Sequence, residues 1–304
     1  MRAQLCQGLI ELSSNEEMIF LTGDLGFMAL EGLQEKLQNR FINAGVAEQN
    51  MIGVAAGMAS EGMIPWVYSI APFCYARPFE QIRNDVAFHN LPVKLLGNGG
   101  GYGYGVMGPS HHAIEDYGVL QTLPNFKIYI PCFNEDIDSV LSLANSNSSP
   151  TYIRLGYDES SNEFKPPKYK PWRQLTSGGG PVVIVAGPIA TTYIEGFQQL
   201  DKKIRPNMWL LSELPIRKGF LPKELIEQIK LQKNLYIIEE HVAQGGIASQ
   251  ISLLLMKINL RVDSFTHLYA KSHHFERYGS QKFLRKKSAI DLNSVLKMIL
   301  KNKL

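Results

Sequence analysis

One carboxylate stands at the start of a segment that is otherwise built of small apolar residues. Glu48 lies in RFINAGVAEQNMIGVAAGMASEG, where alanine, valine, isoleucine and methionine follow it at helical spacing. A glutamate at this place can cap a helix or stabilise its positive end. It can also be an acid held against an apolar wall, which would keep a proton available near neutral pH for general acid–base chemistry. The pattern alone leaves both interpretations open.

Two adjacent histidines are the second candidates for chemistry. His111 and His112 occur in GPSHHAIED, directly after the glycine-rich stretch GNGGGYGYG. Histidine is suited to proton transfer because it titrates near neutrality. Glycines between residues 97 and 105 would let a tight loop approach a ligand. Because no Walker lysine follows them, a nucleotide P-loop is excluded.

The bulk composition limits the class of protein. The chain has 304 residues, 45% of them hydrophobic and 19% charged, with a formal net charge of +3. This is enough apolar material for two domains, and the small charge disfavours a nucleic-acid partner. No apolar run reaches the roughly 18 residues that span a bilayer. Cys6, Cys74 and Cys132 form no CxxC pair and indicate reduced thiols. We expect a cytoplasmic globular protein that binds neither nucleic acid nor membrane.

Strand-like runs alternate with helix-like segments, which is typical of parallel sheets with helices on their faces. We predict an α/β protein of two domains, each a mostly parallel sheet flanked by helices. The domains are expected at residues 1–160 and 181–304, with a polar linker at 161–180. The chemistry should lie at the carboxyl ends of the strands. The predicted strands are Met18–Thr22, Val67–Ile70, Val93–Gly97, Thr151–Leu155, Val182–Ala186, Met208–Leu211 and Leu235–Glu239.

Helices are predicted where apolar residues recur at a period near 3.6. In the lysine-rich C-terminal segment, apolar residues at core-like spacing indicate a docked helix and not a basic tail. The predicted helices are Ala47–Glu61, Pro78–Phe88, Ile189–Leu200, Lys223–Leu231, Gln244–Ile258 and one within 282–303.

Six motifs in the first half resemble, in the right order, the pyrimidine-binding domain of transketolases and 1-deoxyxylulose-phosphate synthases. They are GDLG, RFINAGVAEQN, GMASEGMIPWVYS, PFEQIRNDV, GYGYGVMGPSHHAIED and PTYIRLG. The second half is similar to the C-terminal domain of the same family through VVIVAGP, LPIRKGFLP and YIIEEHVAQGGIASQ. The resemblance covers nearly the whole chain.

The resemblance implies a thiamine-diphosphate site. Glu48 matches the glutamate that hydrogen-bonds N1′ of the cofactor's aminopyrimidine, where proton exchange activates the thiazolium ring. Phe73 matches the aromatic residue that stacks on that ring, and Ile70 takes the place of a preceding aromatic. His111 matches the histidine that faces the substrate, whereas His112 is expected to be structural. The predicted catalytic residues are therefore Glu48 and His111.

The family's diphosphate and magnesium motif belongs to a domain that precedes the one seen here. Gly23–Asp24–Leu25 falls at the end of the first strand, so it is not this motif, and we expect no metal ligands in the chain. Because Met1 directly precedes the family's opening pattern, we expect a separate transketolase N-terminal-type subunit to hold Mg²⁺. The cofactor would then be shared between the two chains in an α2β2-like complex.

Four departures from the family concern the substrate. Positions that hold the sugar phosphate or a donor hydroxyl correspond to Arg2, Met28, Met107 and Tyr157. An arginine binds phosphate far better than a tyrosine, so ordinary pentose phosphates are not expected. The resemblance implies transfer of a two-carbon ketol unit between sugar-type substrates, including a modified or nucleotide sugar.

Three other functions stay open. The β subunit of a 2-oxoacid dehydrogenase shares the two-domain layout, and a synthase-like acyl transfer uses the same domain. A non-catalytic scaffold is the third. In the second half, Glu239–His241 and the glycines after it could bind an anion at a helix start, but a structural role is expected. His273 and His274 are expected at the surface.

Overall fold

The computed structural model describes residues 1–161, 163–216, 219 and 221–301. The first half holds six strands and the helices that surround them. The strands are β1 (Met18–Thr22), β2 (Phe41–Asn43), β3 (Ile64–Ile70), β4 (Lys94–Asn98), β5 (Lys127–Tyr129) and β6 (Thr151–Arg154). The helices are α1 (Arg2–Leu12), α2 (Glu31–Leu37), α3 (Glu48–Ser60), α4 (Ala71–Tyr75), α5 (Phe79–Gln81), α6 (Asp116–Leu120) and α7 (Asp136–Asn145). Single turns of tighter or wider helix are η1 (Gln38–Arg40), η2 (Ile82–Ala87), η3 (Gly105–Met107) and η4 (Pro109–His111).

The second half repeats the alternation. Its strands are β7 (Trp172–Thr176), β8 (Val182–Ala186), β9 (Asn207–Leu211), β10 (Glu213–Leu214), β11 (Asn234–Glu239) and β12 (Ser264–Tyr269). Its helices are η5 (Pro188–Ala190), α8 (Thr191–Gln198), α9 (Lys223–Gln232), α10 (Ile247–Lys257), α11 (Gln281–Lys287) and α12 (Leu292–Lys301).

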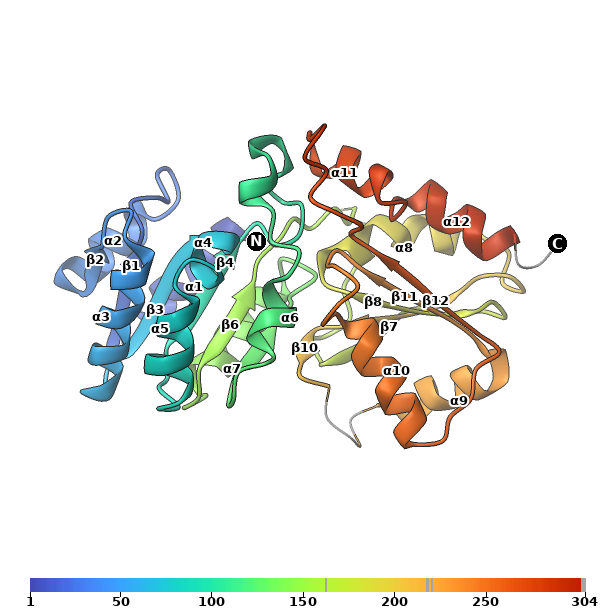
Figure 1. Ribbon diagram of the computed structural model, residues 1–304, viewed down its shortest axis with the longest axis horizontal. Coiled ribbons are helices and arrows are strands. Elements are labelled where there is room, and N and C mark those ends of the chain that lie inside the picture. Colours follow the sequence, from blue (N-terminus) through green and yellow to red (C-terminus); the bar gives the residue numbers. More distant parts are fainter. Residues whose placement is uncertain (162, 217–218, 220, 302–304) are drawn as a thin grey trace.

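Two sheets lie side by side, one in each half (Figure 1). The strand order is β10-β5-β6-β4-β3-β1-β2 in the first sheet and β12-β11-β8-β9-β7 in the second. Neighbouring strands are parallel, except that β10 is antiparallel to β5 and β7 is antiparallel to β9. The predicted fold class, two mostly parallel sheets flanked by helices, is confirmed.

Alternating side chains of each strand enter separate cores. In β8, Val182 and Ile184 face the core that includes α9 and α10, whereas Val183 and Val185 face α8, α11 and α12. Figure 1 shows these two groups of helices on opposite sides of the sheet. A strand buried on both faces is a continuous apolar run, which is why the sequence pattern identified β8 within a residue.

One part of the predicted linker is wrong. Residues 161–180 contain β7, which forms the edge of the second sheet and pairs with β9. Edge strands carry polar residues and lie close to prolines, so the segment does not have the apolar pattern of an inner strand. The division into domains at residue 160 therefore stays a proposal.

The lysine-rich end of the chain packs against the second sheet, as predicted, but as two helices instead of one. Leu284 of α11 and Val295 and Ile299 of α12 are buried, as is Ile290 between them. Residues 302–304, which the predicted helix reached, lie outside the described residues. In the described part of the chain, no helix is both long and apolar enough to cross a membrane.

Candidate active site

Glu48 is the first residue of α3, and its side chain is only 2% exposed. The residue that caps the helix is Ala47, which has no side chain to do so. Glu48 Oε2 instead accepts a hydrogen bond of 2.5 Å from Nη1 of Arg77. Gly23, from the GDLG motif, lies behind the other oxygen: a Cβ added there would be 3.6 Å from Oε1. The acid is thus buried, but a cation lies beside it as well as the expected apolar wall.

Phe73 lies in α4 and is half-buried. The guanidinium carbon of Arg77 lies 4.3 Å from the centroid of its ring. The imidazole of His111 meets the same ring edge-on, with centroids 5.1 Å apart and planes at 76°. Ile70 ends β3, directly before the helix turn that carries Phe73. The structure therefore brings three of the predicted residues, Glu48, Phe73 and His111, around a single arginine.

His111 is placed by a tight loop. Its backbone N–H donates to Gly108 O at 3.0 Å, and its Nδ1 lies 3.0 Å from Ser110 Oγ. The loop is closed behind it, because Gly101 and Ala113 exchange two backbone hydrogen bonds as an isolated bridge. The ring is half-exposed, which leaves it accessible to a substrate.

His112 points the other way and is 2% exposed. Neither ring nitrogen has a hydrogen-bond partner among the described residues. Burial lowers the pKa of His112 to about 4, and the neighbouring His273 adds to this effect. The two imidazoles stack with centroids 5.6 Å apart. The structural interpretation of His112 fits this environment.

The predicted surface position of His273 and His274 is wrong. His273 Nε2 lies 2.6 Å from Glu115 Oε1, on the helix start that follows the His111 loop. His274 Nε2 lies 3.0 Å from Ser288 Oγ. Both side chains are half-buried. His273 and Glu115 are 158 positions apart in the chain, so local sequence could not reveal their contact.

The four predicted substrate positions are only partly brought together. Arg2 lies near the phenols of Tyr68 and Tyr104 and lowers the pKa of each, although burial raises the pKa of both above the usual range. Tyr157 also acts on both phenols. Met107 donates its backbone N–H to Tyr104 O. Three of the four positions are therefore neighbours of one tyrosine.

Met28, the fourth position, lies in the loop between β1 and α2. Its side chain is exposed, and its backbone N–H donates to Glu31 Oε1 at 2.6 Å. No contact joins it to the other three substrate positions in the described structure. Its role stays a prediction.

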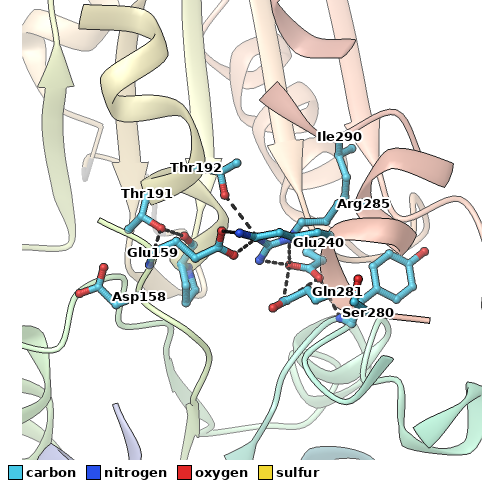
Figure 2. A network of polar contacts seen from close by, with 12 residues as sticks. Asp158, Glu159, Thr191, Thr192, Glu240, Ser280, Gln281, Arg285 and Ile290 are labelled. Carbon is cyan, nitrogen blue, oxygen red and sulfur yellow. Dashed lines mark hydrogen bonds and ion pairs between the residues drawn. The ribbon is translucent and has the colours of Figure 1, made fainter. Parts of the chain in front are cut away.

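The second half supports the His111 loop through Glu240 (Figure 2). Glu240 Oε1 accepts from the backbone N–H of Tyr102, in the glycine-rich stretch, at 2.9 Å. Its other oxygen accepts from Nε and Nη2 of Arg285, at 3.1 and 2.8 Å. Arg285 also donates to Glu159 Oε1 at 2.6 Å. Although burial alone would lower the pKa of Arg285, the paired carboxylates keep it raised.

The Glu239–His241 motif is structural. Glu239 accepts hydrogen bonds from the first backbone N–H groups of α10, those of Ile247 and Ala248, at 2.8 and 3.2 Å. The chain's own carboxylate thus fills the site where an anion would bind. His241 stacks on Tyr117 at 4.0 Å. Within the described ranges, no three His, Cys, Asp or Glu side chains are grouped to hold a metal ion.

Sequence reasoning missed two residues at this site, Arg77 and Glu240. Arg77 follows Phe73 by four positions, and residues at this spacing are neighbours on a helix. That spacing was a usable signal for a contact with the aromatic ring. Glu240 gave no such signal, because its partner Tyr102 is 138 residues away.

Comparison with known proteins identifies the class. Residues 10–159 match the family described as transketolase, pyrimidine binding domain. One of the two subunits of an apulose-4-phosphate transketolase from Phocaeicola vulgatus is 28% identical over 298 residues, which cover 92% of this chain and 93% of that protein. A 1-deoxy-D-xylulose-5-phosphate synthase of Clostridium beijerinckii is 27% identical over 283 residues, 90% of this chain and 44% of that protein.

A solved structure described as a split gene transketolase, inactive beta4 tetramer, has a TM-score of 0.81 and 26% identity, and covers 99% of this chain and 96% of that one. The chain belongs to the transketolase family, whose members are thiamine-dependent transferases. Within that family it is a split transketolase subunit, made of the pyrimidine-binding domain and the C-terminal section.

Proposed function

We propose that this subunit works in an enzyme that transfers a two-carbon ketol unit between sugar-type substrates. The observation that carries the proposal is the meeting of Glu48, Phe73 and His111 at one place, each at the position where the family motif predicts it. The relatives named as transketolase subunits support the same reaction class. When bound, thiamine diphosphate would supply the nucleophilic carbon of this reaction.

Three side chains would hold the cofactor's aminopyrimidine. Glu48, which is buried, would hold a proton at the N1′ nitrogen, where the low exposure strengthens the hydrogen bond. Phe73 would offer the face of its ring for stacking, and Ile70 would complete the wall with an aliphatic side chain. His111 is half-exposed beside Phe73, and its imidazole would give or take a proton at a substrate hydroxyl.

We propose that a separate transketolase N-terminal-type subunit holds Mg²⁺ and the diphosphate. Asp24, in the GDLG motif, is paired with Asn43, whose amide donates to Asp24 Oδ1 at 2.9 Å. The proposal of an α2β2-like complex is supported by exposed apolar side chains, which mark association surfaces. Those that flank the site in the sequence are Phe27, Met28, Val46, Val54, Val106 and Met107.

The substrate is proposed to be a sugar that differs from the ordinary pentose phosphates. Arg2 supplies one guanidinium near Tyr68 and Tyr104, and Tyr157 replaces a second one. One arginine among phenols can hold an anionic or hydroxylated group but gives fewer charge-assisted hydrogen bonds than two arginines. The free thiols Cys6, Cys74 and Cys132 support a cytoplasmic location.

The test is reconstitution with a transketolase N-terminal-type chain from the same organism. Glu48→Gln keeps the size of the side chain and removes the exchangeable proton. We expect it to lower the rate of ketol transfer at least about 100-fold, with an unchanged circular dichroism spectrum. Glu61→Gln, at the exposed far end of α3, is the matched control and should keep the wild-type rate.

Two outcomes contradict the proposal. A Glu48→Gln complex with the wild-type rate removes the assigned role of this acid. Thiamine-dependent release of carbon dioxide from 2-oxoacids, without ketol transfer, identifies a dehydrogenase subunit, and no cofactor-dependent activity with any donor identifies a scaffold.

A further inference from the structure

Arg77 contacts both side chains that the proposed function assigns to the aminopyrimidine. Its Nη1 donates to Glu48 Oε2 at 2.5 Å, and its guanidinium carbon lies 4.3 Å from the ring centroid of Phe73. We call the place that these two side chains define the aminopyrimidine seat. In this structure the seat is filled by the chain's own guanidinium.

The guanidinium and an aminopyrimidine make the same two contacts. A guanidinium is planar, stacks on aromatic faces and donates hydrogen bonds to carboxylates. An aminopyrimidine is also planar, stacks on the same kind of face and meets the same carboxylate through a nitrogen. Two planar groups cannot occupy one face of Phe73 at stacking distance together.

We propose that Arg77 is a gate on the cofactor site, which covers the aminopyrimidine seat in the isolated chain and leaves it when the cofactor binds. This inference rests on the proposed function. It names a residue that sets cofactor affinity by competition, and the cofactor's pyrimidine must displace it.

The environment of Arg77 allows this movement. Its side chain is 40% exposed and its one carboxylate partner is Glu48. By contrast, Arg154 and Arg285 are 4% and 3% exposed, and each makes several charge-assisted hydrogen bonds. A long exposed side chain with a single ionic contact can be moved into water at little cost.

The covering position also has a benefit for the isolated chain. A buried carboxylate without a partner is strongly unfavourable. Arg77 compensates the charge of Glu48 until the pyrimidine arrives, and then returns to solvent. The same contact that stabilises the empty chain therefore lowers its affinity for the cofactor.

The test uses the isolated full-length chain and a fragment of the cofactor, 4-amino-5-hydroxymethyl-2-methylpyrimidine, which needs no diphosphate site. Its dissociation constant is measured by calorimetry or by ligand-observed NMR. Removing the competing guanidinium with Arg77→Ala should raise the affinity about tenfold, as expected for one charge-assisted contact. Arg77→Lys keeps the charge without the planar stack and should fall between the two.

Arg83→Ala is the matched control. Arg83 also lies over an aromatic ring, with its guanidinium carbon 4.6 Å from the centroid of Phe88, but its side chain donates to Asn84 and not to Glu48. This substitution should leave the affinity unchanged. Melting temperatures of all variants verify that each chain is folded.

The outcomes separate the gate from the proposed function. If the pyrimidine binds in a Glu48-dependent manner but Arg77→Ala leaves its affinity unchanged or lowers it, the gate is wrong and the seat stands. A lowered affinity identifies Arg77 as a residue that holds Glu48 in place. If no variant binds the pyrimidine at millimolar concentration, both the seat and the gate are wrong.

Discussion

Glu48, Glu239 and Glu240 are all almost completely buried, but their partners differ in mobility. The carboxylate of Glu239 accepts from backbone N–H groups of α10, which cannot leave without unfolding the helix. Glu240 is held by Arg285, whose own side chain is buried. Only Glu48, among these three, has a partner that is largely exposed, Arg77. This difference makes Glu48 the acid that can exchange its partner for a ligand.

His112 gives a prediction for the dependence of stability on pH. Burial, and then the charges of His273 and His274, lower its pKa to about 4, while Glu115 acts in the opposite direction. The unfolded chain binds the proton more readily than the folded chain between the ordinary pKa of 6.5 and about 4. The stability is therefore fully present above pH 6.5 and is lost as the pH falls to about 4, by up to about 3 kcal/mol.

The measurement compares urea unfolding of the wild type and His112→Phe between about pH 4 and about pH 7.5, a range that spans both pKa values. The difference in free energy of unfolding between the two proteins should change in favour of the variant as the pH falls. Curves that stay parallel over this range would show that His112 remains neutral in both states or finds a partner.

The residues of the site differ in how far their sequence predicts them. Glu48, Phe73 and His111 stand in local motifs, and the structure brings all three together. Arg77 and His273 owe their importance to side chains that reach across the fold. Distances of this kind depend on the packing of both halves, which no local pattern encodes.

At the scale of elements, the loop that carries His111 is supported by the second half of the chain. Backbone N–H groups of Tyr102 and Val242 donate to Glu240 Oε1 and Ile114 O, at 2.9 and 2.8 Å. Gly118 N–H donates to His241 Nε2 at 3.1 Å. The loop and the start of α6 are therefore held from behind, while the His111 side faces solvent.

Gly101 tests this support. It has a φ of +67°, and an added Cβ would lie 2.8 Å from the Cδ and Cγ atoms of Glu240. Because Glu240 is held in a buried ion pair, it cannot move away easily. We expect Gly101→Ala to lower the free energy of unfolding by about 3 kcal/mol, the sum of backbone strain and overpacking.

Gly62→Ala is the control for backbone strain alone. Gly62 has a φ of +91° with no atom within 4 Å of the added Cβ, so it should cost only about 1 kcal/mol. Urea unfolding measures both variants. Equal losses in the two would mean that Glu240 does not press on the loop.

The elements themselves follow from periodicity more reliably than the loops do. All seven predicted strands are present with ends within three residues of the prediction. The predicted helix Pro78–Phe88 is α5 followed by a wider π turn, η2. β2, β7 and β10 were not predicted, because short or edge strands have few apolar residues and depend on their partner for register.

At the scale of the whole molecule, the two halves are joined by more than the connecting segment. β10 follows β9 of the second sheet but pairs with β5 of the first, with Glu213 opposite Tyr129. Arg173, on β7, makes a bidentate ion pair with Asp136 at the start of α7, with both contacts at 2.6 Å. Asp136 also accepts from the backbone N–H groups of Cys132 and Phe133.

This ion pair predicts a large loss of stability when one partner is removed. Arg173 and Asp136 side chains are each 2% exposed. Arg173→Met leaves a buried carboxylate without its cation, which costs about 3–5 kcal/mol. Lys230→Met breaks the exposed pair with Glu227, where both side chains are more than half exposed, and should cost under about 0.5 kcal/mol.

Calorimetric melting and urea unfolding of both variants measure the contrast, and the shape of the transition adds a second readout. If the Arg173–Asp136 pair joins the halves into one cooperative unit, Arg173→Met should split the single transition into two or lower its urea dependence. The double variant Arg173→Met with Asp136→Leu removes both charges and should recover most of the loss, because a buried ion pair replaced on both sides is close to neutral. A single variant as stable as the wild type would show that the connection between the halves lies in β10 and the Glu240 network instead.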